Sequence, residues 1–433
     1  MNPSAIQCWL NNISETKTPH QSPQQPLKRK RDEADLPGPL ISPMSSPPKR
    51  NAPDLDQTPQ SLKDVQQQGF LHRNFSFRPS PSPSKRRRAS PSKRHTTTAS
   101  LKLLDPPIYV INPEDLVSAL SDDLVKLYDE LFMVIHKQAI LPPNLKRIPD
   151  SDVVGRAKTL PYMWQDVDDE TQDELLRHQH ERLRDILHEA TEASTMTKGE
   201  SAWNAQVHYP ILDLALKPIA TVKPETITNA QIVKEFRPIS LDQTWSSASS
   251  SAASSVTSSH ISEQEASVHT MVDFALVLLP DFTLEAKIKA FLDKADYSTV
   301  NHTVYDALSR RPAPVFIETK TSAGVVDKSH AQLGIWTAAW FMRLRAANSS
   351  RRAIGIPVIQ VHGHVWTVMF AMDEGDKIVL LDQAIRIGDT ANVVGAYQLI
   401  AALRTFGKWM GAGFRTWLGE FLDGAIETTV NTT

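Results

Sequence analysis

The chain has 433 residues, 40% of them hydrophobic, and a formal net charge of −2, so it is long enough for more than one folded domain. Its single cysteine, Cys8, excludes an intramolecular disulfide framework and favours a cytosolic or nuclear protein. The sequence shows neither a secretory signal nor a run of about 18 apolar residues that could cross a bilayer, so we expect no membrane partner.

The first hundred residues differ in composition from the remainder. They hold half of the 30 prolines, many Ser-Pro and Thr-Pro pairs and few large apolar side chains. Lysine and arginine number 16 there against 7 acidic residues, whereas the remainder has 31 basic and 42 acidic residues. Such a segment cannot bury enough surface to offset its chain entropy. We therefore expect residues 1–100 to be a disordered basic tail joined to a mildly acidic folded region.

Two dense basic clusters lie in this tail, LKRKRD at 27–32 and KRRRASPSKR at 85–94. Solvated charge in a disordered arm is one explanation. Two clusters beside Ser-Pro sites favour nuclear-import signals that bind an import receptor, with nucleic-acid contact as a further option. Phosphorylation at sites such as Ser82 and Ser90 would add negative charge and weaken this attraction. The expected location is the nucleus, and otherwise the cytoplasm.

The folded region is expected from residue 101 to residue 425, with a short C-terminal tail over 426–433. In its first part, SDDLVKLYDELFMVIHKQAI has apolar residues at helical spacing behind a Ser121 cap. A highly charged stretch predicts a second helix over 169–192.

The middle of the chain predicts a third helix and an insertion. The helix spans 199–216, and Pro210 within it predicts a kink or a break because proline has no N–H to donate. The serine-rich stretch that follows predicts a flexible insertion over 245–265.

The remaining sequence predicts a mixed α/β fold. Strands are expected at HTMVDFALVLLP and PVFIETK, with a short helix and then a helix or loop between them. A strong helix over 329–347 follows. IPVIQVHGHVWTVMFAMDEGDKIVLLDQ predicts three antiparallel strands that turn at His362-Gly363 and near Gly375. A helix over 390–406 and a Trp-containing helix complete the domain.

The strand PVFIETK ends in two opposite charges. Phe316, Glu318 and Lys320 share one face because side chains alternate along a strand. Taking these charges out of water costs free energy unless something there uses them. The alternative is an exposed pair, worth less than about 1 kcal/mol. The flanking Val-Phe-Ile predicts burial and favours a functional pair.

From residue 200 the expected order is helix, strand, strand, strand with Glu-x-Lys, helix, strand. This order resembles the PD-(D/E)XK nuclease superfamily, whose restriction-endonuclease-like core is αβββαβ with a mixed central sheet. GESAWNAQVH, TMVDFALVL, PVFIETKTS and AQLGIW carry the resemblance, in the family's order and on the matching elements. More narrowly, the chain resembles nuclease-like proteins of filamentous fungi. The resemblance covers about residues 101–425.

The resemblance implies a metal-dependent nuclease. Mg²⁺ (or Mn²⁺) neutralises the charge that develops on phosphate oxygens during hydrolysis, and Mg²⁺ prefers oxygen ligands. By this resemblance Asp273 and Glu318 supply carboxylate ligands and Thr319 supplies its backbone carbonyl. Lys320 holds or helps to deprotonate the attacking water.

Glu200 and Gln332 match the helical glutamate and the glutamine of the family, which implies roles at the same site. Each also fits a capping box, Thr197-x-x-Glu200 and Ser329-x-x-Gln332, which would explain both residues as helix starts alone. Both interpretations stay open at this point.

The literal Pro-Asp of the family name occurs at Pro280-Asp281 and competes with Asp273. In a hairpin the start of the first strand faces the end of the second, so the neighbour of Glu318 lies near the start of the preceding strand. Asp281 is eight residues further on, about 26 Å away at ~3.3 Å per residue. We therefore choose Asp273 and expect Asp281 to be a turn residue.

Other chemistry-bearing residues have simpler explanations. The histidines show no metal-ligand spacing and are expected in core or surface positions: His208, His302, His362 and His364. The tryptophans are expected in the core rather than as base-stacking platforms: Trp336, Trp340, Trp366 and Trp409.

Two functions follow from these observations. The first is a metal-dependent nuclease that acts on nucleic acid, with DNA favoured over RNA. The acidic folded region opposes phosphate binding, although six arginines could form a basic rim: Arg310, Arg311, Arg343, Arg345, Arg351 and Arg352. The alternative is an inactive nuclease-fold protein that serves as a nuclear scaffold binding nucleic acid or protein. The sequence gives no oligomeric state.

The basic tail generates a first prediction. Deleting residues 1–100 should leave thermal unfolding of the remainder nearly unchanged, because the tail adds nothing to a packed core, and should move the protein from the nucleus to the cytoplasm. Calorimetry and fluorescence microscopy of a tagged chain measure the two effects. Unfolding of the truncated protein, or unaltered localisation, would contradict the interpretation of the tail.

Overall fold

The computed structural model describes residues 97–148, 159–166, 173–240, 271–348 and 351–432. The chain divides into two units, Met1–Pro83 and Ser84–Thr433, and all described residues belong to the second. The predicted tail over 1–100 therefore lies almost entirely outside the described residues, and so does the serine-rich insertion.

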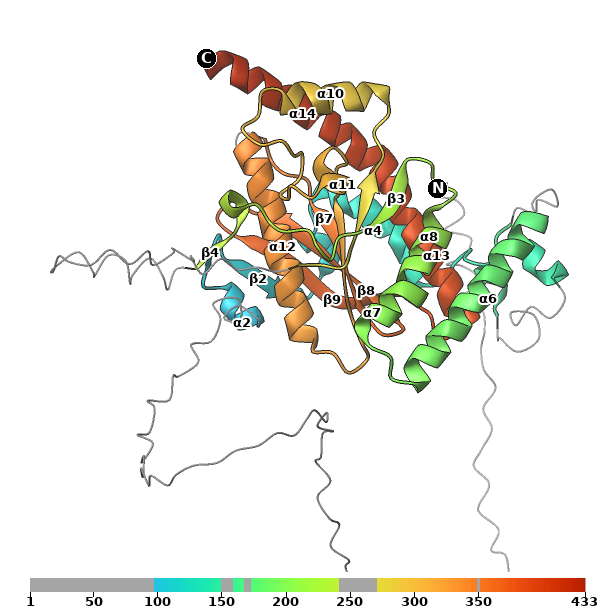
Figure 1. Ribbon diagram of the computed structural model, residues 1–433. Coiled ribbons are helices and arrows are strands. Elements are labelled where there is room, and N and C mark those ends of the chain that lie inside the picture. The colour runs from blue at the N-terminus through green and yellow to red at the C-terminus, as the bar shows by residue number, and fades with distance from the viewer. Residues whose placement is uncertain (1–96, 149–158, 167–172, 241–270, 349–350, 433) are drawn as a thin grey trace, which may run out of the picture. The chain divides into compact units, whose positions relative to one another are not determined.

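The central feature is a seven-stranded mixed sheet in the order β2-β9-β8-β7-β6-β5-β3. The β2–β9 and β6–β7 pairs are parallel and the other neighbours are antiparallel (Figure 1). Its strands are β2 (Ile108–Ile111), β3 (Val222–Thr226), β5 (Phe274–Leu278), β6 (Val315–Lys320), β7 (Ile356–His362), β8 (Val365–Asp373) and β9 (Ile378–Asp389). Two short strands, β1 (Leu104–Asp105) and β4 (Ile239–Ser240), pair separately.

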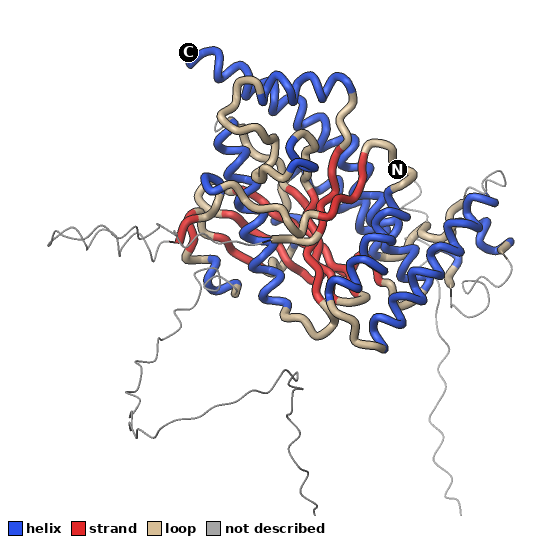
Figure 2. The backbone as a smooth tube through the Cα atoms, in the orientation of Figure 1, coloured by secondary structure: helices blue, strands red, loops and turns tan. Residues whose placement is uncertain are grey.

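Helices cover both faces of the sheet (Figures 1 and 2). Helix α12 packs against β6 and β7, while α4 and α13 pack against β9, and α8 packs against β3. The longer helices are α4 (Asp122–Ile135), α6 (Asp173–Thr195), α8 (Tyr209–Leu216), α10 (Phe282–Leu292), α12 (Val326–Ala347), α13 (Val393–Trp409) and α14 (Arg415–Thr432).

Shorter helical segments connect these elements. They are α2 (Thr98–Leu101), α3 (Leu116–Ala119), η2 (Pro143–Arg147), η3 (Pro161–Met163), α7 (Glu200–Trp203), η5 (Asn204–His208), η6 (Lys234–Phe236), α11 (Asp306–Ser309) and η7 (Met410–Phe414). None of the helices in the described part is long and apolar enough to cross a membrane.

The αβββαβ order expected from residue 200 is confirmed as α8, β3, β5, β6, α12 and β7. The three strands at 356–389 are antiparallel as predicted, and both turn glycines, Gly363 and Gly375, have positive φ. The four tryptophans expected in the core are buried. Helix α14 continues to Thr432, through most of the segment 426–433 that the sequence assigned to a tail.

Pro210 produces a widened turn rather than a break. The helix from Glu200 to Leu216 continues through a π-helical segment, η5, which lies directly before α8. Proline cannot give an N–H to the preceding turn, and the longer hydrogen-bonding interval of the π-turn accommodates it. Such single π-turns occur often at functional sites, and η5 contributes to the pocket described next.

Candidate active site

The pairing of β5 with β6 places Asp273 beside Glu318. Phe274 pairs with Ile317, and the Asp273 N–H donates to the Ile317 carbonyl at 3.1 Å. Asp273 is therefore one residue beyond the last pair of the ladder, opposite Glu318. The hairpin argument for choosing Asp273 holds in the structure.

Asp281 lies beyond the other end of β5. The sequence analysis expected a turn residue at this position, and that prediction is wrong. Asp281 is the N-cap of α10, because its carboxylate accepts the Leu284 N–H at 3.0 Å, and it also pairs with Arg415. The sequence Asp281-Phe-Thr-Leu begins a helix directly after the strand, and an aspartate suits that position.

The charged end of β6 is buried. Asp273, Glu318 and Lys320 are 7%, 1% and 8% exposed, which excludes the alternative of an exposed surface pair. The Lys320 ammonium donates to Glu318, to the Thr319 carbonyl at 2.8 Å and to Glu200 at 3.3 Å. Two carboxylates and one backbone carbonyl thus bind a single ammonium group.

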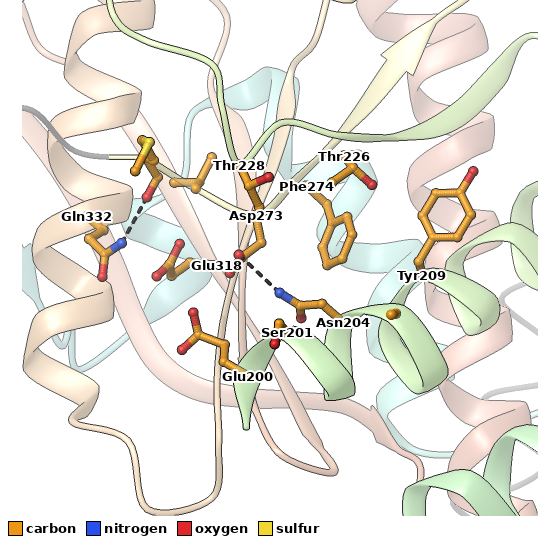
Figure 3. Close-up of a pocket in the computed structure, with 13 residues that line it drawn as sticks. Glu200, Ser201, Asn204, Tyr209, Thr226, Thr228, Asp273, Phe274, Glu318 and Gln332 are labelled. Carbon is orange, nitrogen blue, oxygen red and sulfur yellow. Dashed lines mark hydrogen bonds between the residues drawn. The ribbon is translucent and has the colours of Figure 1, made fainter. Parts of the chain in front are cut away.

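The capping-box explanations for Glu200 and Gln332 are wrong. Helix α7 begins at Glu200 behind Gly199, and α12 begins at Val326, a full turn before Ser329. Gln332 instead lies within α12 and lines the pocket, where its side chain donates to the Met271 carbonyl at 2.8 Å. Both residues therefore face the same cavity as Asp273 and Glu318 (Figure 3).

This cavity has a volume of about 680 Å³ and lies between α7, η5, β5 and α12. In Figure 3 the carboxylates of Glu200, Asp273 and Glu318 gather at one end, and Tyr209 lies at the other beyond Phe274. Side chains of Ser201, Ala205, Thr226 and Thr228 complete much of the wall.

The electrostatics reflect an excess of negative charge. Burial, together with the nearby Asp273 carboxylate, raises the pKa of Glu318 to about 8 despite Lys320. Burial lowers the pKa of the Lys320 ammonium, but Glu318, Glu200 and Asp273 outweigh burial and hold that pKa above its usual range. The site therefore favours additional positive charge.

Within the described residues, no three His, Cys, Asp or Glu side chains group as a metal-binding cluster. The set expected from the sequence is smaller: two carboxylates and the Thr319 carbonyl. All of these donors are oxygens, which fits a hard cation such as Mg²⁺. A raised pKa for Glu318 fits too, because a cation there would offset the repulsion between Glu318 and Asp273.

A polar network that the sequence analysis missed forms hydrogen bonds with the Asp273 carboxylate. Asn204 donates to Asp273 at 3.1 Å, and its side-chain oxygen accepts from the Thr319 hydroxyl at 2.7 Å. The Thr319 N–H donates to Asp273 at 2.9 Å, and the Thr319 hydroxyl oxygen lies 2.8 Å from the same carboxylate, so its single proton is shared between Asp273 and Asn204. These contacts hold the Asp273 carboxylate in one orientation.

His208 continues this network across the sheet. Its Nδ1 lies 2.9 Å from the Asn204 oxygen, and its Nε2 lies 3.0 Å from the Gly363 carbonyl. The Gly363 N–H donates to the Lys320 carbonyl at 2.8 Å, which returns the chain of contacts to β6. Burial lowers the pKa of His208 to about 4, so the ring is neutral at ordinary pH.

The sequence carried a signal for these residues. Asn204 and His208 are four residues apart in WNAQVH, a spacing that puts both on one helix face. Because His208 lacks metal-ligand spacing, the sequence analysis expected it only in a core or surface position. In the structure its ring nitrogens contact Asn204 and Gly363.

The predicted basic rim does not form as a set. Arg343 is only 2% exposed and donates to the Thr299 carbonyl. Arg345 pairs with Asp373, Arg351 with Glu420, and Arg311 lies 3.7 Å from Glu225. Three of the six guanidinium groups are therefore paired with the protein's own carboxylates.

The sequence matches the model of the PD-(D/E)XK nuclease superfamily over residues 151–415, more than half of the chain. The chain belongs to this superfamily. No curated protein matches the sequence. The superfamily core agrees with the observed αβββαβ order, and its nuclease-type domain includes every residue of the cluster described above.

Asn204→Ala should destabilise the fold by about 1–3 kcal/mol, because it removes a donor to Asp273 and leaves buried polar atoms of Thr319 and His208 without this partner. Chemical denaturation in the presence of a metal chelator measures the effect. Gln206→Ala is the matched control, since Gln206 lies in the same π-segment and bonds the surface residue Lys198. Equal costs for the two variants would contradict a supporting role for Asn204.

Glu318→Gln should become more stable relative to the wild type as pH rises. The folded-state pKa of Glu318, about 8, is above its ordinary value of 4.5. Between these values the folded state retains a proton that the unfolded state releases, so the free energy of unfolding falls as pH rises. Glutamine cannot lose that proton, and the difference should reach on the order of 3 kcal/mol near pH 8.

Denaturation curves from pH 5 to pH 8, in chelator, test this prediction. Glu420→Gln serves as the control, because that side chain is 60% exposed. A difference between Glu318→Gln and wild type that stays constant with pH would show that Glu318 carries no raised pKa.

Proposed function

We propose that this protein is a divalent-metal-dependent nuclease that hydrolyses phosphodiester bonds, with DNA as the favoured substrate. The observation that supports the proposal most directly is the buried cluster of Asp273, Glu318 and Lys320 at the end of an open cavity. Burying three ionisable groups opposes folding, and perturbed ionisable groups in a cleft are typical of catalytic sites.

In the proposed site Asp273, Glu318 and the Thr319 carbonyl hold Mg²⁺ or Mn²⁺. The cation, when bound, supplies positive charge against the charge that develops on the phosphate oxygens. Asn204 and the Thr319 hydroxyl keep the Asp273 carboxylate oriented.

Lys320 has the second proposed role. Its ammonium is fixed by Glu318, by the Thr319 carbonyl and by Glu200. If Glu318 and the Thr319 carbonyl held a cation, the Lys320 ammonium would lose these contacts and would be available to hold the attacking water. Glu200 accepts from Lys320 on the exposed side and limits how far the ammonium moves.

The alternative, an inactive scaffold with the nuclease fold, predicts no need for these charges. Without chemistry, the buried Glu318 and Lys320 would only cost stability, and an apolar pair of similar volume would serve the core better. The complete cluster therefore favours the enzyme.

Three variants test the proposed chemistry. Glu318→Gln should lower metal affinity and cleavage together, because one ligand charge is lost, and excess metal should restore only part of the activity. Lys320→Met should keep metal binding but lose cleavage by about a hundredfold or more. Asp281→Asn is the control and should cleave as wild type does, since Asp281 caps α10 at the far end of β5.

Calorimetric titration with Mg²⁺ and Mn²⁺, beside cleavage assays on single-stranded and duplex DNA and on RNA, measures these effects. Wild-type protein that binds neither metal and cleaves none of the substrates would overturn the enzyme and favour the scaffold. An Asp281→Asn variant that behaves like Glu318→Gln would mean that the wrong aspartate was chosen.

A further inference from the structure

The far end of the cavity differs in chemistry from the carboxylate end. Tyr209 is 39% exposed, and its ring lies 6.3 Å from that of Phe274 at an angle of 35°. Phe274 is buried in β5 and backs the tyrosine from the core side. The exposed side chain of Thr226, which pairs with Phe274, lies beside the rings. This end therefore offers an aromatic face with hydroxyl groups beside it.

The charges on the wall restrict what the cavity can hold. Glu200, Asp273 and Glu318 line it, and none of the described residues that line it is lysine or arginine. Phosphate groups bind where lysine and arginine neutralise them. A polynucleotide backbone laid along this wall would meet repulsion. The rest of the cavity suits an uncharged group.

The size of the cavity is consistent with such a group. Its volume of about 680 Å³ is within the range typical of small-ligand sites, about 300–1,000 Å³. A nucleobase combines a flat apolar face with hydrogen-bonding edges, which matches an exposed tyrosine beside Thr226. Stacking of a base on an aromatic ring tolerates any base sequence.

We propose that this cavity is a base-binding subsite in which the base of one unpaired nucleotide of a single strand stacks on Tyr209. The proposal rests on the proposed function for the identity of the polymer, but its binding step needs no catalysis. It assigns the substrate class as single-stranded or frayed nucleic acid, because a base within a duplex is not free to enter the cavity.

Binding can be measured without cleavage. The full chain, in a metal chelator, is titrated into a twelve-nucleotide single strand of DNA that carries the fluorescent base 2-aminopurine at one end. Separate probes carry it at the 5′ end and at the 3′ end. Stacking on Tyr209 should quench the fluorescence of one of the two probes, and anisotropy of the same strand gives the dissociation constant.

Tyr209→Ala should weaken binding by about tenfold to a hundredfold and remove the quenching, since base stacking on an aromatic ring is lost. Tyr209→Phe retains the ring and should stay within about twofold of wild type. Tyr162→Ala is a matched control, because Tyr162 is 51% exposed in η3 and does not line the cavity. It should bind as wild type does.

A second variant avoids the objection that Tyr209→Ala disturbs folding. Ala205 is exposed in η5 and lines the cavity, so Ala205→Phe adds a ring that fills the space while Tyr209 remains. This variant should also lose binding by tenfold or more. Unchanged binding by both Tyr209→Ala and Ala205→Phe overturns the subsite.

A blunt duplex of the same sequence separates the subsite from ordinary backbone binding. The duplex should compete poorly for the protein, because its bases are paired. Equal competition by the duplex overturns the assigned substrate class. A wild-type chain that binds the strand through Tyr209 but cuts nothing with Mg²⁺ keeps the subsite and overturns only the nuclease, so the two proposals fail separately.

Discussion

The pairing of β5 with β6 is the constraint on which the site depends. The bond from the Asp273 N–H to the Ile317 carbonyl fixes the register, and a slip of one residue would turn Glu318 away from Asp273. The pairing is reinforced on both sides, because β3 continues the antiparallel sheet beyond β5 and β7 runs parallel to β6. The charged end of β6 is thus placed by apolar strands whose side chains are almost wholly buried.

Burying the cluster of Asp273, Glu318 and Lys320 costs free energy, and hydrogen bonds from the surrounding polar network offset part of that cost. Asn204 and His208 reach the end of the sheet from a widened helical turn, and their contacts return to β6 through the tight turn at Gly363. Gly363 has φ +53, and a Cβ there would lie 2.1 Å from the Ser322 hydroxyl, so only glycine fits this turn easily. Backbone shape and side-chain chemistry therefore act together to hold Thr319 and Lys320.

Much of this arrangement was accessible from the sequence, for physical reasons. Alternation along PVFIETK identified the face shared by Glu318 and Lys320, and hairpin geometry selected Asp273 over Asp281. Helix starts were harder to predict from the sequence. The capping boxes at Thr197 and Ser329 were plausible local signals. However, α12 begins a turn before Ser329, where Asp327 accepts the Thr98 N–H from a distant segment of the chain. His208 and the arginines depend on long-range partners such as Gly363 and Asp373, which local patterns do not contain.

The same negative charge explains both ends of the cavity. Burial and the nearby Asp273 carboxylate raise the pKa of Glu318. The excess of carboxylates favours an added cation and makes the wall unsuitable for a run of phosphates. Arg345 and Arg351 are paired with the protein's own acids, so these two guanidinium groups offer little compensation. In this cavity a nucleic acid then gains affinity through an uncharged base at the aromatic end. Recognition through a base rather than through the backbone follows from the charge distribution that the proposed chemistry requires.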